Sequence, residues 1–533
     1  MSTENTKYGD GALQNNTTVE GQNSAFGFSA LQLSTAKWNT AVGAFSGAST
    51  TTGISNTSVG VNSLLQNTSG SYNTALGTAA LLKNTTGYNN TAVGSNSMQE
   101  NTTGQYNLAI GDNALYANTT GDFNVAMGSN ALRANTTGQK NMAIGLNALI
   151  FANAEDNLAI GHASMGFANV TGSSNVGLGR NTLQQLTSGI ENVAIGPLSL
   201  NLNETGSFNI GIGYKSLENN TNSYNIGIGS SVLRANTTGQ GNTAIGYNAS
   251  RDNTTGQNNV AVGNQALYTN TTAENNVAIG HFALNKNVDI GGLVAVGSLA
   301  LQNNTGGFNT AVGYSALNAN TSGFANTAVG SRALKVNTTG NYNSAFGNQT
   351  LEVNTGDNNT AFGASSLLLN TSGNQNTALG SGAGNTITTG SNLSCIGYNA
   401  LPSSATAINE ITLGNTAIAT LRCNVTSITS LSDARDKKDI VELDAGLDFV
   451  QKLKPVSFTW NMRDGGKIDI PDTGFIAQDL KQVQIDTGID IPYLVYEPTP
   501  EKMEACYGKL LPVLVKAIQD LKKEVDELKA QIK

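Results

Sequence analysis

One short stretch decides the fold: Asn90-Thr-Ala-Val-Gly94, which returns as Asn107-Leu-Ala-Ile-Gly111 and again as Asn124-Val-Ala-Met-Gly128. Each copy is followed by a short polar or Ala-Leu segment and then by an Asn-Thr-Thr-Gly turn, such as Asn118 to Gly121. Over residues 8–400 the chain repeats this unit of roughly 16 to 18 residues. A fixed short period indicates a solenoid, in which each unit buries its apolar face only against its neighbours.

The chemistry of the unit predicts short β-strands. In Asn192-Val-Ala-Ile-Gly196, alternation places Val193 and Ile195 on one face and Ala194 on the other. We expect the Val/Ile face to fill a core and the small Ala face to let another backbone approach closely. Asn-Thr-Thr-Gly favours turns, and stacked asparagines are expected to form hydrogen-bonded ladders between coils. A helical shaft is excluded because every unit carries glycine and β-branched or turn-forming residues.

The composition supports a repeat array. The 533 residues are too many for one ordinary core, and they hold 61 glycines, 8 prolines and 12 % charged residues. Scarce proline and charge argue against a disordered chain, and collagen is excluded because no strict glycine period exists. The formal net charge of −8, without any stripe of Lys or Arg, argues against nucleic acid as a partner.

The sequence predicts no membrane insertion, no cofactor and no metal. The N-terminus lacks a signal-type apolar stretch, and no apolar run approaches the length that spans a bilayer. Cys395, Cys423 and Cys506 are far apart and odd in number, so we interpret them as small hydrophobes of a reducing compartment. His162 and His281 occupy equivalent positions many coils apart and are expected to face outward.

The repeat resembles a known family. Asn192 to Gly196 and Asn276 to Gly280, both Asn-Val-Ala-Ile-Gly, are similar to the head repeats of trimeric autotransporter adhesins. The resemblance implies a left-handed parallel β-roll whose copies associate in threes. It covers about three-quarters of the chain, although the period here is longer and the Asn-Thr-Thr-Gly insert is extra. A bacterial surface adhesin is therefore one candidate function.

The chemistry changes abruptly at Ser432. Residues 432–533 hold 15 of the 28 Lys+Arg and 19 of the 36 Asp+Glu, which marks a separate globular domain. We therefore divide the chain into a β-solenoid shaft at 1–400, a β-rich neck at 401–431 and a C-terminal α+β domain at 432–533. The predicted fold class is mainly β, with a repetitive parallel shaft expected to be trimeric.

Within the C-terminal domain, the patterns predict a short amphipathic helix over 445–453, a strand over 456–460 and a turn at 464–466. A buried strand is expected to begin at 474–478. The segment 510–533 is predicted to be a coiled-coil helix, because apolar residues recur at alternating spacings of three and four. These are Leu511, Leu514, Ile518, Leu521, Val525, Leu528 and Ile532.

Four motifs follow one another in this domain: residues 432–440 (SDARDKKDI), 453–460 (LKPVSFTW), 474–478 (GFIAQ) and 510–521 (LLPVLVKAIQDL). Their order resembles the C-terminal intramolecular chaperone domain of phage tail spikes and fibres, the endosialidase type. The resemblance implies a domain that trimerises and templates the folding of the β-rich region before it. It also implies that the domain then cuts itself off on the N-terminal side of a serine.

The matching serine is Ser432 and the matching lysine is Lys437, so the bond to be cut is Leu431–Ser432. A serine hydroxyl becomes a nucleophile when a base takes its proton, and a lysine whose pKa is lowered by burial serves as that base. Such a reaction is a single-turnover, self-cleaving serine endopeptidase step. The alternative is structural: Ser432 before Asp433 suits a helix N-cap, and Lys437 with Lys438 suits a solvated pair.

The leading interpretation is a viral tail or capsid fibre, made in the host cytoplasm and carried on the virion. It is expected to be a homotrimer that binds a host surface receptor, a glycan by preference, and docks onto another virion protein. The second candidate is the bacterial trimeric adhesin. A third is a glycan-cleaving tail spike, which requires a carboxylate pair such as Glu155 and Asp156.

Overall fold

The computed structural model describes residues 4–16, 21–418, 420–422, 432–463, 467–499 and 502–532. The chain divides into two units, 1–339 and 340–533, which are described separately below. The predicted fold class is confirmed, since the chain is mainly β and its repeats form a parallel β-solenoid.

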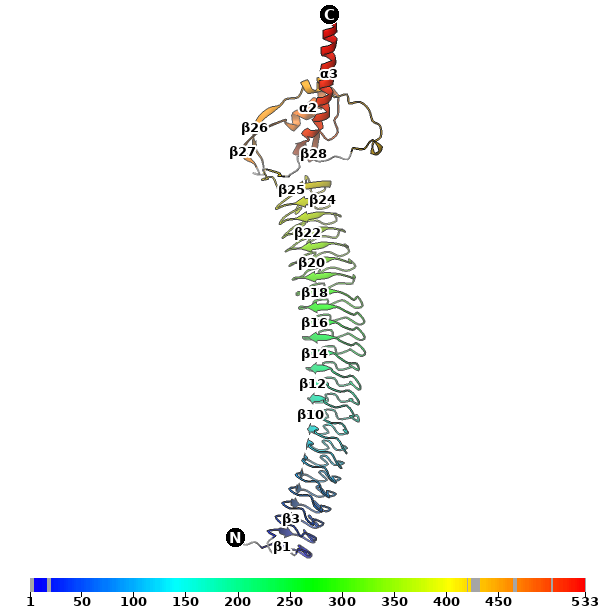
Figure 1. Ribbon diagram of the computed structural model, residues 1–533, viewed down its shortest axis with the longest axis vertical. Helices are drawn as coiled ribbons and strands as arrows, with labels where there is room; N and C mark the ends of the chain where they lie inside the picture. The colour runs from blue at the N-terminus through cyan, green and yellow to red at the C-terminus, as the bar shows by residue number, and fades with distance from the viewer. Residues whose placement is uncertain are drawn as a thin grey trace. The chain divides into compact units, whose positions relative to one another are not determined.

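In the first unit, each repeat contributes one strand of three residues, and consecutive strands pair in parallel (Figure 1). In the register of β6, β7 and β8, Ala92 lies beside Ala109 and Ala109 beside Ala126. The strands are β1 (Thr6–Tyr8), β2 (Ser24–Phe26), β3 (Thr40–Val42), β4 (Thr57–Val59), β5 (Thr74–Leu76), β6 (Thr91–Val93), β7 (Leu108–Ile110), β8 (Val125–Met127), β9 (Met142–Ile144), β10 (Leu158–Ile160), β11 (Val176–Leu178), β12 (Val193–Ile195), β13 (Ile210–Ile212), β14 (Ile226–Ile228), β15 (Thr243–Ile245), β16 (Val260–Val262), β17 (Val277–Ile279), β18 (Val294–Val296), β19 (Thr310–Val312) and β20 (Thr327–Val329).

The inside of each coil is narrow and lined by small residues. In the coil of β7, Ala109 of the strand and Ala114 and Leu115 of the opposite segment are all fully buried. Asn107 and Asn118 are also buried in this coil. A coil interior of this width holds alanine, one leucine and two asparagines, and each coil completes its core against the coils beside it.

The predicted assignment of the two strand faces is wrong. Ala194 and Asn192 are fully buried, whereas Val193 and Ile195 are only partly buried on the outer side of the coil. The alternation itself is as predicted, but the small face points inward because the coil interior has no room for two branched side chains per strand. The Val/Ile face is therefore an outward apolar row on the shaft.

The predicted asparagine ladders are confirmed. Asn107 Oδ1 accepts the backbone N–H of Asn124 at 2.8 Å, and Asn124 Oδ1 accepts that of Asn141 at 3.0 Å. A second ladder runs through the Asn-Thr-Thr-Gly turns, where Asn118 Nδ2 donates to Asn101 Oδ1 at 2.8 Å. Each ladder satisfies polar groups that would otherwise be buried without partners.

The glycine after each strand is required by the close approach of the next coil. Gly111 has φ +135°, and a Cβ built on it would lie 2.6 Å from the carbonyl oxygen of Gly128. Side chains rarely adopt this conformation, and the contact is with backbone that has no freedom to move aside. Glycine at this position therefore sets how closely the coils stack.

The second unit begins with further solenoid strands and ends in a small α+β domain. Its solenoid strands pair in parallel, and the two strand pairs of the domain are antiparallel. The elements are β21 (Ser344–Phe346), β22 (Thr360–Phe362), β23 (Thr377–Leu379), β24 (Ser391–Ile396), β25 (Ile408–Leu413), η1 (Ala434–Asp436), α1 (Leu447–Gln451), β26 (Val456–Asn461), β27 (Ile468–Gly474), α2 (Ala477–Thr487), β28 (Val495–Thr499), β29 (Lys502–Ala505), η2 (Tyr507–Lys509) and α3 (Leu510–Gln531).

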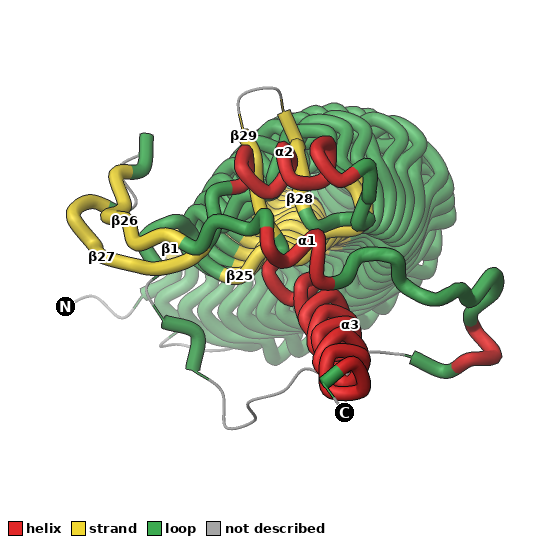
Figure 2. Tube along the Cα trace, turned by 90° about the horizontal axis from the view of Figure 1, so that it is seen from above, coloured by secondary structure: helices red, strands yellow, loops and turns green. Residues whose placement is uncertain are grey.

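The C-terminal domain has its own hydrophobic core. α1 packs on α3, and α2 lies beside β28 and β29 (Figure 2). The tyrosine hydroxyl of Tyr507 donates to the carbonyl of Phe475 at 2.6 Å and so fixes the chain between β27 and α2. The buried core residues are Ala445, Phe449, Leu480, Val483, Ile491, Leu494, Leu510 and Val513.

Most predicted elements of this domain are present. The helix expected over 445–453 is α1, and the strand expected over 456–460 is β26. The strand expected to begin at 474–478 is wrong, because β27 ends at Gly474 and α2 starts three residues later. The turn expected at 464–466, most of the predicted neck and Cys423 lie outside the described residues.

The terminal helix α3 has two apolar faces. Leu510, Val513 and Ala517 are buried on one face. The residues of the predicted heptad seam, from Leu511 to Ile532, are exposed on the other. Among the described residues, no helix combines the length and the apolar character needed to cross a membrane.

Candidate functional site

A single 3₁₀ turn builds the site at the start of the C-terminal domain. Asp433 is the N-cap of η1, and its Oδ1 accepts the backbone N–H of Arg435 at 2.9 Å. The guanidinium of Arg435 donates back to the same carboxylate, through Nε at 3.0 Å and a terminal nitrogen at 2.5 Å. The turn closes with the N–H of Lys437 donating to the carbonyl of Ala434 at 3.2 Å.

This turn brings the two predicted site residues together. Lys437 Nζ donates to Ser432 Oγ at 2.5 Å, although the two residues are five positions apart in the chain. The geometry matches what nucleophile and base require, which is direct hydrogen-bond contact between their side chains. The structural alternative placed the helix cap on Ser432, whereas the cap is Asp433, so the serine hydroxyl is available to the lysine.

The site is open to solvent within one chain. Ser432 and Lys437 are both exposed. A lysine acts as a base only after losing its proton, and burial is the usual way in which proteins lower a lysine pKa. The single chain therefore supplies the contact between the serine hydroxyl and the lysine amine, but it leaves both side chains exposed.

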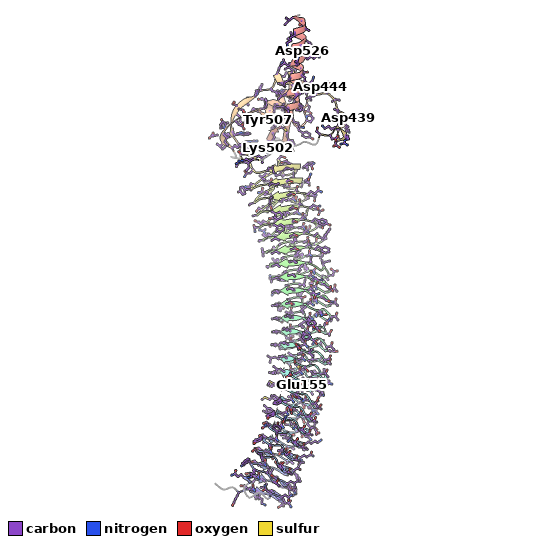
Figure 3. All side chains as sticks on the ribbon, viewed as in Figure 1. Glu155, Asp439, Asp444, Lys502, Tyr507 and Asp526 are labelled. Atoms are coloured by element: carbon purple, nitrogen blue, oxygen red, sulfur yellow. The ribbon has the colours of Figure 1, made fainter. Side chains whose placement is uncertain are left out.

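The segment after the site carries unusual exposed apolar residues. Ile440 and Val441 are 71 % and 84 % exposed, although both are branched aliphatic residues. They lie between Asp439 and Asp444, and Asp439 marks the loop that carries the site (Figure 3). Apolar side chains this open, on the loop that carries Ser432 and Lys437, are a candidate contact surface.

The charge of the turn is fixed by one ion pair. The hydrogen bonds from Arg435 lower the pKa of Asp433, and the same pairing raises the pKa of the guanidinium. The carboxylate is therefore ionised at neutral pH and retains its capping role. The sequence alone did not single out Asp433 and Arg435, although Asp two residues before Arg is a recognisable capping signal.

The other predicted candidates do not form a site. Glu155, labelled in Figure 3, and Asp156 are consecutive exposed residues. His162 and His281 are exposed as expected. Among the described residues, no three His, Cys, Asp or Glu side chains lie together in a way that could hold a metal ion. Leu431, the other side of the predicted scissile bond, lies outside the described residues.

Comparison with known proteins supports the C-terminal assignment. Residues 432–489 match the family model described as chaperone of endosialidase, a peptidase family. The match begins at Ser432 and includes the turn that joins it to Lys437. No curated protein and no solved structure matches the chain. The chain is thus a β-solenoid repeat protein with a C-terminal segment that is similar to the endosialidase chaperone family, and the adhesin resemblance of the shaft stays a prediction.

Proposed function

We propose that the chain is a subunit of a homotrimeric viral tail or capsid fibre, folded by its C-terminal chaperone domain and matured by cutting Leu431–Ser432. The observation that carries this proposal is the 2.5 Å contact between Lys437 Nζ and Ser432 Oγ at the start of the matched segment. The fibre itself is the solenoid, which holds the sites for a host receptor and for another virion protein.

Trimerisation is supported by two unpartnered apolar surfaces, both of which suit further copies of the same chain. The third residue of every strand from β2 to β20 is aliphatic, Phe or Met, and none is fully buried. A charge-free row that recurs in register on every coil fits an identical row on a copy. The seam of α3 is the second such surface, and heptad residues are buried when parallel helices associate.

Assembly also completes the chemistry in this proposal. Covering Ile440 and Val441 with another copy removes water from the loop that carries Ser432 and Lys437. The desolvated lysine then takes the serine proton, and the serine oxygen attacks the Leu431 carbonyl. The lysine returns the proton to the leaving amine, which is the new amino-terminus of the released domain. Water then hydrolyses the ester between Leu431 and Ser432, which leaves a carboxylate on Leu431 of the shaft and restores the Ser432 hydroxyl on the released domain.

The test is intact mass and denaturing electrophoresis of full-length wild type beside Ser432→Ala and Lys437→Met. We expect wild type to separate into a shaft and a C-terminal piece of about a fifth of its length, while both variants stay at 55.0 kDa. Native mass of the uncut Ser432→Ala chain should be three times the chain mass. Wild type that stays uncut after forming trimers contradicts the self-cleaving role, and a monomeric Ser432→Ala chain contradicts the assembly.

A further inference from the structure

A row of exposed aromatic residues runs along the shaft of the first unit. The position concerned directly precedes the buried asparagine of each strand, as Tyr106 precedes Asn107. At this position the backbone is left-handed, with φ +56° at Tyr106 and at Phe123. The aromatic residues that occupy it are Trp38, Tyr72, Tyr106, Phe123, Phe208, Tyr224 and Phe308.

Neither the backbone nor the core explains these aromatic residues. Left-handed φ is unfavourable for bulky side chains and easiest for asparagine and glycine, which occupy the same row at Asn89, Asn258 and Gly241. Burial compensates only in part, since Tyr106 is 45 % and Phe123 is 51 % exposed. Rings that stay half exposed in an unfavourable backbone conformation are candidates for contact with a ligand.

This row is also distinct from the outward strand row that suits subunit contacts. The aromatic row carries Lys140, Asp156 and Glu191 in other coils, all at left-handed positions. Unpaired charges of both signs are costly inside an interface between copies, where charged residues are depleted. The strand row contains no charged residue from β2 to β20. We infer that the aromatic row faces solvent in the assembled fibre.

Two neighbours in the row, Tyr106 and Phe123, form a patch with three residues that lie one position before the row, which are Tyr88, Gln105 and Asp122. The rings of Tyr88 and Tyr106 meet edge to face with centroids 5.3 Å apart, and the Tyr106 and Phe123 rings stack with centroids 5.0 Å apart. Beside them, the backbone N–H of Gln105 donates to Asp122 Oδ1 at 2.8 Å. A continuous aromatic surface is thus bordered by an amide and a carboxylate.

We propose that this patch (Tyr88, Gln105, Tyr106, Asp122 and Phe123) binds a neutral glycan, which gives the proposed receptor function its site. Aromatic rings accept the C–H faces of sugar rings, and amide and carboxylate groups pair with hydroxyls. The patch has no Lys or Arg and holds one carboxylate, so it disfavours an anionic glycan.

The test uses affinity electrophoresis of the full-length protein in native gels that contain dextran, galactomannan, barley β-glucan or, as the anionic probe, alginate. The patch variant is Tyr106→Asn with Phe123→Asn, because asparagine already occupies this row and preserves the backbone. The matched control is Phe308→Asn, the same change in the same row outside the patch. We expect a gel that contains one of the neutral glycans to retard wild type and the control equally. The patch variant should bind the same glycan at least tenfold more weakly.

Three outcomes overturn the inference: no retardation of wild type in any neutral gel, equal retardation of the patch variant, or retardation by alginate alone. A patch variant that changes oligomeric state in sedimentation also overturns it, because the row would then be a contact between copies. Self-cleavage is measured on the same preparations. Normal cleavage without glycan binding removes this inference alone, whereas failed cleavage of wild type counts against the proposed function.

Discussion

Replacing Asn225 with alanine tests whether the buried asparagine ladder holds the coils together. Asn225 Oδ1 accepts the backbone N–H of Asn242 at 3.1 Å, which has no other acceptor among the contacts of this ladder. Its Nδ2 donates to the Gly239 carbonyl at 2.9 Å and to Asn220 Oδ1 at 3.0 Å. Both of these oxygens also accept from Asn236 Nδ2, so they keep a partner in the variant.

The expected loss of stability follows from which buried groups lose their hydrogen-bond partner. The Asn242 N–H is left buried without an acceptor, which costs about 1–3 kcal/mol. The bonds to the Gly239 and Asn220 oxygens are lost while those oxygens stay paired, at about 0.5–1 kcal/mol each. Two longer bonds are also lost, from Asn225 Nδ2 to the Ser223 carbonyl at 3.2 Å and from Asn242 Nδ2 to Asn225 Oδ1 at 3.3 Å, but Asn242 Nδ2 keeps the Gly256 carbonyl and Ser223 is only partly buried. The total is about 3 kcal/mol, and in a repeat protein it is concentrated in the coils that share the ladder.

The assay is native-state hydrogen exchange on the full-length chain, with protection at the Asn242 amide as the readout. A loss of about 3 kcal/mol corresponds to a fall in protection of roughly a hundredfold, if the amide exchanges by local opening. The control is Asn219→Ala in the same coil, because Ala117 and Ala235 occupy the equivalent position in other coils. Protection in Asn225→Ala that stays within threefold of the control refutes the stabilising role of the ladder.

Three further substitutions or reactions have defined outcomes. Gly111→Ala should lower the thermal midpoint of unfolding and produce aggregation, because the added Cβ would lie 2.6 Å from a backbone oxygen. The control Gly307→Ala should be tolerated, because its Cβ would meet only one methyl group at 3.8 Å. Iodoacetamide at pH 8 should label the exposed Cys506 and spare Cys395 until the chain unfolds, as peptide mass spectrometry would report, since burial raises the pKa of Cys395 to about 11. Asp433→Ala should slow self-cleavage about tenfold or more and Asp433→Ser should restore it, because serine can cap the turn. Because the pKa of the Asp433 carboxyl is lowered, its capping contribution is fully present above the ordinary aspartate pKa and is lost only as pH falls through the lowered value. The contribution of the cap to the cleavage rate should therefore stay constant from pH 5 to 8. Equal cleavage rates in wild type and Asp433→Ala contradict the capping role.

The sequence was sufficient to predict the period, the strand type and the asparagine ladders, because each depends on local residue chemistry repeated in register. It failed on the direction of the strand faces. Hydrophobicity favours Val193 and Ile195 as core residues, but the inside of a coil is limited by its volume. Alanine and a single leucine fill that volume, so the larger aliphatic residues are placed outside. Only the closed geometry of the coil reveals this limit.

At the site, the resemblance supplied Ser432 and Lys437, and the structure supplied the reason that they meet. Residues five positions apart are not neighbours on a regular helix or strand. A 3₁₀ turn capped by Asp433 brings them into contact, and its length is set by the two bonds that open and close it. Neither bond follows from hydrophobic periodicity, which is why pattern analysis placed the cap one residue too early.

The inverted strand faces and the exposed turn that carries Ser432 and Lys437 have one physical explanation. The coil interior is already filled by alanine, leucine and asparagine, so the outward aliphatic row has no place inside its own chain. The seam of α3 and the pair Ile440 and Val441 are apolar and open for the same reason, since their own domain core is complete without them. In the proposed function, these apolar surfaces and Lys437 become buried only when copies of the chain associate. Stability and self-cleavage should then rise together with protein concentration, because the same contacts supply both.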